Sequence, residues 1–243
     1  MERPSKDIIA QLRKDLLVMG GLKIPAIALS PGTALPFMRP CLPNGCFPLA
    51  AVHEFLSAEP GTLAPSQGFI AALVHLLFPQ KKVIAWVTSS KVFPPALKNF
   101  GISPDQVLFI HPSGIKESLW VTEEALRCRG ITAVVTELNG FDFTQSRRFQ
   151  LAVEQSGVTG FILNSRKGNA AANACVSRWQ IRAAPSQHPA DLPGVGLPAW
   201  EADLQKMRNG KKGNWVLQWK ENRMQQVILP VSIAAVERKK IAG

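Results

Sequence analysis

The sequence predicts an α/β fold, in which a mostly parallel sheet is flanked by helices and continues into antiparallel C-terminal strands. Two observations lead to this prediction. Between residues 47 and 165, short apolar runs alternate with segments of helical apolar spacing, the pattern of a parallel sheet covered on both faces. After residue 175, runs of alternating apolar and polar residues follow one another around a proline-rich stretch. Such alternation is typical of antiparallel strands with one solvated face.

The parallel part is expected to hold five strands separated by four helices. Its strands are apolar along most of their length because both faces of such a sheet are buried. Its helices end near glycines, for example Gly101 and Gly130. In chain order the expected elements are strand 50–56, helix 67–78, strand 82–88, helix 94–100, strand 106–111, helix 115–128, strand 131–138, helix 146–155 and strand 157–164.

The remaining segments complete the domain organisation. Antiparallel strands are expected at 176–183, 199–207, 215–220 and 225–229, so that the core domain spans 47–229, followed by a basic tail at 230–243. Residues 24–46 contain five prolines and are interpreted as an extended linker. Residues 1–23 are predicted to form an amphipathic helix, because Ile8, Leu12 and Leu16 recur at helical spacing. This apolar stripe needs a partner surface and is a candidate docking helix.

Net charge is the clearest compositional signal. The chain carries 28 Lys and Arg against 17 Asp and Glu, a net charge of +11. Residues 166–243 hold 13 of these cations and 5 of the acids, a balance of +8. A basic C-terminal third indicates an anionic partner, either nucleic acid or an acidic protein surface, although ordinary solubility charge is the alternative.

Several classes of protein are disfavoured by the sequence. No apolar run reaches the length of a transmembrane helix, and the N-terminus does not resemble a signal peptide. The four cysteines form no CxxC pair and are expected to be reduced thiols of a cytoplasmic protein, with no metal site. No catalytic motif is present, and the four histidines are scattered. We therefore expect no catalytic residues and no cofactor.

The segment between the first strand and the first helix is the most informative. A phosphate-binding loop of a P-loop NTPase, G-x-x-x-x-G-K-[ST], would lie here. The chain instead has SAEPGTLAPSQG at 57–68, with no Lys, an acid and two prolines. These residues offer neither the N–H donors nor the positive charge that phosphate requires. A fold of this type without the loop predicts a binding role rather than hydrolysis.

A series of segments resembles the ImuA family, RecA-related accessory proteins of bacterial DNA-damage-induced mutagenesis. The resemblance covers roughly residues 47–220. The segments that carry it are VIAWV at 83–87, PPALKNFGI at 94–102, ESLWVTEEALRC at 117–128, AVVTEL at 133–138 and SRRFQLA at 146–152. It implies a RecA-like P-loop NTPase core with a degenerate loop. It also implies a role in translesion synthesis in the SOS response, beside an ImuB-like Y-family protein and an error-prone replicative-type polymerase, at the nucleoid after damage.

The comparison with RecA assigns site residues one by one. Gly61 and Thr62 remain in the loop, Pro65 occupies the place of the missing Lys, and Ser66 that of the magnesium-binding hydroxyl. Ser89 and Ser90 replace the region of the catalytic glutamate. Glu137 lies where the acid of the second nucleotide motif would end its strand; a solvated acid at a strand end is the alternative.

Basic residues and one tryptophan are the candidate contacts to a partner or DNA. Lys206 and Arg208 resemble a Lys-x-Arg pair that reaches a neighbour's phosphate in hexameric RecA-like ATPases, and Lys211 and Lys212 follow in the same loop. A solvated hairpin tip explains them equally well. Arg147 and Arg148 begin a helix, where cations oppose the helix dipole, so either a partner or a salt bridge to Glu137 or Asp142 is expected. Of the six Trp residues, Trp219 is the candidate for stacking on a base.

Three hypotheses follow. The leading one is a non-catalytic RecA-like adaptor for a lesion-bypass polymerase assembly. A residual ATP-binding enzyme, built on Gly61, Thr62, Ser66 and Glu137, is the second. The third is an antagonist of RecA-type filaments that docks through the helix of residues 1–23. Direct DNA binding is a question within the first and the third.

Overall fold

The computed structural model describes residues 35–57, 63–79, 83–90, 92–165, 172–186 and 196–227. Their strands form one sheet of nine in the order β3-β2-β4-β5-β1-β6-β7-β8-β9. The pairs from β3 to β6 are parallel, and β7, β8 and β9 are added antiparallel. The predicted fold class is therefore confirmed. Each parallel crossover lets a helix cover a face of the sheet.

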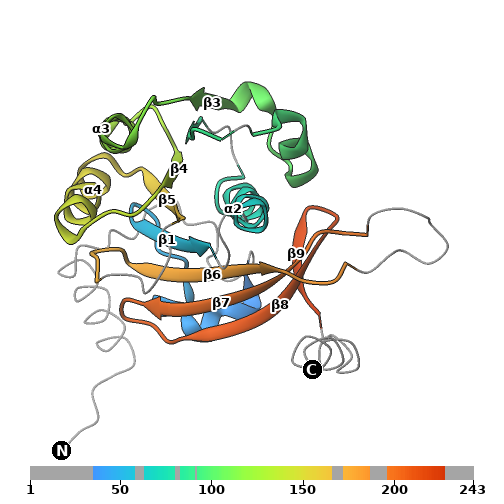
Figure 1. The fold of residues 1–243 in the computed structure, drawn as a ribbon. Helices are drawn as coiled ribbons and strands as arrows, with labels where there is room; N and C mark the ends of the chain where they lie inside the picture. The colour runs from blue at the N-terminus through green and yellow to red at the C-terminus, as the bar shows by residue number, and fades with distance from the viewer. Residues whose placement is uncertain are drawn as a thin grey trace, which may run out of the picture.

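The parallel half alternates strands and helices as the sequence predicts. Its elements are β1 (Val52–Ser57), α2 (Ala64–Leu77), β2 (Ile84–Val87), the 3₁₀ helix Pro94–Phe100, β3 (Val107–Ile110), α3 (Ile115–Arg127), β4 (Ala133–Leu138), α4 (Phe143–Ser156) and β5 (Thr159–Asn164). Helix α2 lies on one face of the sheet, and α3 and α4 lie side by side on the other (Figure 1).

Three of these elements differ from the prediction. Helix α2 begins at Ala64, three residues before the predicted start at 67. The segment Pro94–Phe100 is a 3₁₀ helix, which suits a short piece that opens with two prolines. Helix α4 begins at Phe143, because Asp142 caps it and accepts a hydrogen bond from the Gln145 backbone N–H. The spacing Asp-x-x-Gln is a capping-box signal in the sequence. The predicted start at Ser146 overlooks that signal and is wrong.

The C-terminal strands extend the sheet beyond β1. They are β6 (Ser177–Ala183), β7 (Ala199–Met207), β8 (Gly213–Lys220) and β9 (Arg223–Gln226). Strand β6 is parallel to β1, so the predicted antiparallel addition at 176–183 is wrong. The direction changes between β6 and β7. Strand β9 begins two residues earlier than expected, directly after the turn residues Glu221 and Asn222.

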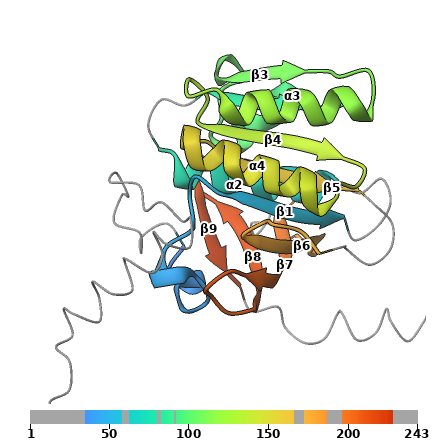
Figure 2. The ribbon, with the colours of Figure 1, turned by 90° about the vertical axis from the view of Figure 1, so that its left-hand side faces the viewer.

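Two hydrophobic cores lie on the two faces of the sheet. The larger, on the side of α2, gathers aromatic rings from distant segments. In it Phe55 of β1 stacks on Trp179 of β6, with ring centroids 6.1 Å apart, and Phe69 of α2 meets Trp200 of β7 edge-on at 5.7 Å. The smaller core joins α3 and α4 to the sheet. Figure 2 looks onto this second layer, with α3 over β4 and α4 over β5 and β1.

The described end of the predicted linker is part of the larger core. Residues 35–46 form two short 3₁₀ helices, Pro36–Cys41 and Pro43–Gly45, rather than an extended chain. Leu35, Met38 and Leu42 of this segment are buried. The backbone also joins the turn between β7 and β8, where Lys211 N–H donates to the Cys41 carbonyl at 2.9 Å.

Candidate functional site

Glu137 is the centre of a polar cluster at the carboxyl ends of the parallel strands, where ligand sites of such sheets lie. One oxygen accepts a hydrogen bond from Gln67 Nε2 of α2 at 2.6 Å. The other accepts from Thr88 Oγ1 at 2.6 Å and from Ser90 Oγ at 2.7 Å, both just after β2. Thr88 is fully buried, and its hydroxyl also accepts from the Ser90 backbone N–H. The carboxylate thus ties the first turns of α2 to the ends of β2 and β4.

Of the predicted nucleotide-loop residues, only Glu137 takes part in the hydrogen bonds of this cluster. Pro65 and Ser66 lie in the first turn of α2, next to Gln67. Ser66 is fully buried, and its Oγ has no hydrogen-bond partner among the described residues. Gly61 and Thr62 lie outside the described residues. Of the two residues predicted to follow β2, Ser90 binds Glu137, while Ser89 is exposed.

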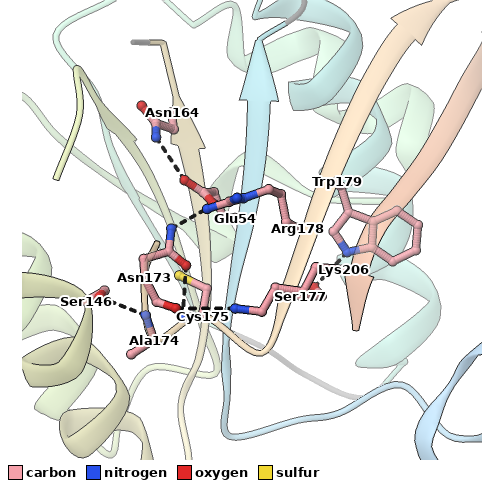
Figure 3. Close-up of polar contacts among 10 residues, drawn as sticks. All are labelled: Glu54, Ser146, Asn164, Asn173, Ala174, Cys175, Ser177, Arg178, Trp179 and Lys206. Atoms are coloured by element: carbon pink, nitrogen blue, oxygen red, sulfur yellow. Dashed lines mark hydrogen bonds and ion pairs between the residues drawn. The ribbon is translucent and has the colours of Figure 1, made fainter. Parts of the chain in front are cut away.

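A second polar cluster surrounds Glu54 in the middle of β1. Its side chain is 1% exposed and forms an ion pair with Arg178 Nε of β6 at 2.6 Å. Asn164 Nδ2 donates to one oxygen at 2.9 Å, and Asn173 Nδ2 to the other at 2.8 Å (Figure 3). A buried carboxylate must be paired in this way, because its desolvation is otherwise costly. The Glu54 carboxylate of β1 therefore links its own strand to three other segments of the chain.

Lys206 and Arg208, predicted to contact a partner, bind the chain itself beside this cluster. Lys206 Nζ donates to the Asn173 carbonyl at 3.3 Å, and Arg208 Nη2 to the Ala174 carbonyl at 2.8 Å. Burial, and then the neighbouring Arg178, lower the pKa of Lys206. Burial also raises the pKa of the Cys175 thiol, which lies against the same group of charges. In this structure both cations hold the segment that leads into β6.

His53 and Ser177 form a polar pair deeper in the sheet. His53 Nδ1 lies 2.7 Å from Ser177 Oγ, and His53 Nε2 lies 2.8 Å from the Pro48 carbonyl. Ser177 Oγ also accepts from Trp179 Nε1. Burial lowers the pKa of His53 to about 4. The imidazole is therefore neutral near pH 7 and serves as a structural hydrogen-bonding group.

Arg147 and Arg148 separate into two environments. Arg148 forms an ion pair with Glu123 of α3 at 2.6 Å, so the suggested salt bridges to Glu137 or Asp142 are wrong. Those acids bind Gln67, Thr88 and Ser90 in one case and the start of α4 in the other. Arg147 is exposed and has no acidic partner among the residues that the structure describes.

The prediction that Trp219 stacks on a base is wrong. The side chain is 3% exposed, and its Nε1 donates to the Asn99 carbonyl at 2.8 Å. It packs against His75 and Phe100. Its place on β8 faces the larger core, and the exposed tryptophan of the described chain is Trp120 of α3, at 63%.

The remaining predicted contact residues fall in two places. Lys211 and Lys212 are exposed beside the turn between β7 and β8. This exposure agrees both with a solvated hairpin tip and with a contact surface. Ile8, Leu12 and Leu16 of the predicted docking helix lie outside the described residues. Sequence reasoning also missed Glu54 and Gln67 as members of polar clusters. An acid inside the apolar run Val52–Leu56 was a usable signal, since such an acid needs a buried partner.

Membrane spans and metal sites are both missing from the described ranges. None of the helices there is long enough and apolar enough to cross a membrane. No group of three or more His, Cys, Asp or Glu side chains in the same ranges is placed to hold a metal ion.

Comparison with known sequences finds two curated relatives. Each is 33% identical to this chain over 214 residues, which cover 83% of this chain and 87% of the relative. Both are named Protein ImuA and come from Caulobacter vibrioides, one from strain NA1000 / CB15N and one from strain ATCC 19089 / CIP 103742 / CB 15. No family model matches the chain.

Proposed function

The chain belongs to the ImuA family, as the resemblance predicted, and we propose that it is a non-catalytic accessory protein of DNA-damage-induced translesion synthesis. In this role it is an adaptor for an ImuB-like Y-family protein and an error-prone replicative-type polymerase. RecA and DNA are further candidate partners. The proposal joins the family resemblance to the local chemistry of the site.

The contacts of Glu137 are the observation that carries the non-catalytic part. Phosphoryl transfer needs a phosphate cradle, a lysine and a metal-binding acid together. The segment 57–68 contains no Lys. Glu137, the acid in the corresponding place, is bound by Gln67, Thr88 and Ser90 of its own chain at 2.6 to 2.7 Å. These three hydrogen bonds support a structural role for Glu137, in which its carboxylate links α2 to the sheet.

The test is a pair of measurements on the purified full-length chain. The first is phosphate release from ATP with Mg²⁺, for which we expect no turnover above the buffer rate. The second is capture of a purified ImuB-like protein, which we expect to be equal with and without ATP. Turnover that disappears in Glu137→Ala would refute the non-catalytic role. Failure to capture the ImuB-like protein under both conditions would refute the adaptor role.

Residual nucleotide binding is a second candidate function, and one observation favours it. Ser66, which corresponds to a magnesium-binding hydroxyl, has a buried Oγ with no hydrogen-bond partner among the described residues. A fluorescent ATP analogue, titrated with Mg²⁺ into the wild-type chain and into Ser66→Ala, separates the two functions. Saturable binding that Ser66→Ala abolishes would support the nucleotide site, and equal curves would exclude a role for this hydroxyl.

A further inference from the structure

Positive charge is concentrated in the C-terminal part of the described chain. Up to residue 165, the described residues carry 7 Lys and Arg against 8 Asp and Glu, a balance of −1. From residue 172 to residue 227, they carry 8 Lys and Arg against 3 Asp and Glu, a balance of +5. The excess of positive charge therefore lies on the part of the sheet that contains β6 to β9.

Four of these eight cations belong to the end of β7 and the turn that follows it. They are Lys206, Arg208, Lys211 and Lys212, and we call them the β7–β8 basic turn. The three lysines are exposed and the arginine is half-buried. None of the four forms an ion pair with an acid among the residues that the structure describes. The turn thus presents positive charge that the described part of the chain does not neutralise.

The surroundings of Lys206 add to this positive charge. Its register partner on β6 is Arg178, so two cations lie opposite each other across the strands, which is an unfavourable arrangement. Glu54, the acid in the same cluster (Figure 3), already forms an ion pair with Arg178 and accepts hydrogen bonds from two asparagine amides. Burial, then the charge of Arg178 and, more weakly, that of Arg208 lower the pKa of Lys206. A bound anion would offset the repulsion among these cations.

The β7–β8 basic turn is fixed to the rest of the protein. The Lys211 backbone N–H donates to the Cys41 carbonyl at 2.9 Å, and Cys41 Sγ donates to the Lys212 carbonyl at 3.3 Å. The side chains of Lys206 and Arg208 each donate to one carbonyl of the segment before β6. Both keep further donors, because a lysine has three and an arginine five. Cations on a fixed backbone bind a ligand at a lower entropic cost than cations on a mobile hairpin tip.

This end of the sheet lacks the apolar groups of a protein interface. The seven exposed large hydrophobic side chains of the described residues all lie between Val83 and Leu151. On β7 and β8, Trp200, Trp215 and Trp219 are buried. Protein interfaces have an apolar centre rich in aromatic residues, whereas interfaces with nucleic acids are more polar and much more positively charged. Without an exposed aromatic ring, the surface also offers no platform on which a base could stack. Its chemistry therefore fits phosphates.

We propose that the β7–β8 basic turn binds the phosphate backbone of DNA, without reading the sequence of its bases. Lysine and arginine side chains donate to phosphate oxygens, and such contacts carry no sequence information. The choice of DNA as the nucleic acid rests on the proposed function. The surface and its phosphate chemistry rest on the charges and contacts described above.

The test measures binding of the full-length chain to fluorescent DNA duplexes of two different sequences, by fluorescence anisotropy at several salt concentrations. The variant is Lys211→Gln with Lys212→Gln. The matched control is Lys98→Gln with Lys116→Gln, which removes two exposed cations from the parallel half. The other two cations of the turn are left in place, because they also hold the segment before β6. All four substituted side chains are exposed, so both variants are expected to fold, and circular dichroism with a urea titration checks this.

The expected result is a change in the salt dependence of binding. Each lost phosphate contact lowers the slope of log Kobs against log salt by about 0.9 in magnitude, so the Lys211→Gln, Lys212→Gln variant should lower it by about 1.8. Its affinity at low salt should fall at least about tenfold, with the control equal to the wild type and the two duplexes bound equally. No binding by the wild type, an unchanged slope in the variant or the same loss in the control would refute the inference.

Capture of the purified ImuB-like protein by the same variant separates this inference from the adaptor function. Unchanged capture together with weakened DNA binding would support both. Lost capture with unchanged DNA binding would overturn the assignment in favour of an acidic protein surface as the partner of the turn. If the wild type binds DNA with the expected slope change but captures no ImuB-like protein, the adaptor function fails while the DNA surface stands.

Discussion

Replacing Glu54 by Gln is expected to destabilise the protein strongly, although the two side chains have nearly the same shape. The carboxylate accepts from Arg178 Nε at 2.6 Å, from Asn173 Nδ2 at 2.8 Å and from Asn164 Nδ2 at 2.9 Å. An amide in its place has one oxygen and one NH₂ group. At least one contact then becomes donor against donor, and Arg178 loses the negative charge beside it.

The expected magnitude follows from burial. Removing one member of a buried ion pair costs about 3 to 5 kcal/mol, because the other charge stays desolvated. The Arg178 side chain keeps 16% of its exposure, so we expect the lower end, about 3 kcal/mol. That corresponds to an increase of roughly 100-fold in the unfolding equilibrium constant.

Urea unfolding of the full-length chain, followed by tryptophan fluorescence, measures this effect as a shift of the midpoint at constant slope. Glu123→Gln is the matched control. Its side chain is similarly buried, at 6%, but its partners Arg127 and Arg148 are 52% and 61% exposed and return to water, so about 1 kcal/mol or less is expected. Equal midpoints for the two variants would refute the reasoning.

Three further predictions follow from the described contacts. Because burial lowers the pKa of His53 to about 4, below its ordinary value near 6.5, His53 contributes stability that is present above about pH 6.5 and is lost as the pH falls toward 4. Urea midpoints should report a loss of about 2 kcal/mol between pH 7 and pH 5, and a smaller loss in His53→Gln; identical pH profiles would contradict this. Ser66→Ala should leave stability unchanged or raise it by about 1 kcal/mol, since it removes a buried hydroxyl with no described partner, and a large destabilisation would show that the hydroxyl is satisfied. Gly101→Ala should cost more than Gly157→Ala in thermal unfolding, because both have positive φ but an added Cβ meets the His75 ring only at Gly101, with nothing within 4 Å at Gly157. About 1 kcal/mol is expected for backbone strain alone, and equal costs would mean that His75 moves aside.

The order of strands and helices could be predicted because each signal is local. The apolar run Ala133–Leu138 and the helix stop at Gly101 act through nearest neighbours. The 3₁₀ form of Pro94–Phe100 and the early start of α4 also depend on neighbouring residues and were therefore predictable. For α4 the local signal is the capping box at Asp142. The parallel direction of β6 was harder to predict. It depends on its pairing with β1, where Glu54 and Arg178 lie 124 positions apart in the chain.

Side-chain roles depended on these distant pairings and were predicted less well. Trp219 and Lys220 alternate along β8, and the sequence does not say which of the two faces the core. The register with β7 and β9 decides it, and Trp219 points inward. The helical spacing of α3 suggests that Trp120 packs on the apolar face of the helix, but its side chain is 63% exposed. Glu137 was found as a strand-end acid, whereas its three partners come from α2 and the end of β2 and could not be assigned without the sheet order.

The position of β1 between β5 and β6 decides how binding regions of this protein can be mapped. A fragment that ends after β5 would leave one edge of β1 with open backbone donors and acceptors beside apolar side chains, and such edges recruit other chains. A fragment that begins at β6 would lack the strand against which β6 pairs. Neither half is expected to behave as an independent folding unit, and apparent loss of partner binding in a truncated protein would report aggregation rather than the site. Point substitutions on the intact chain are therefore the means of locating its contacts.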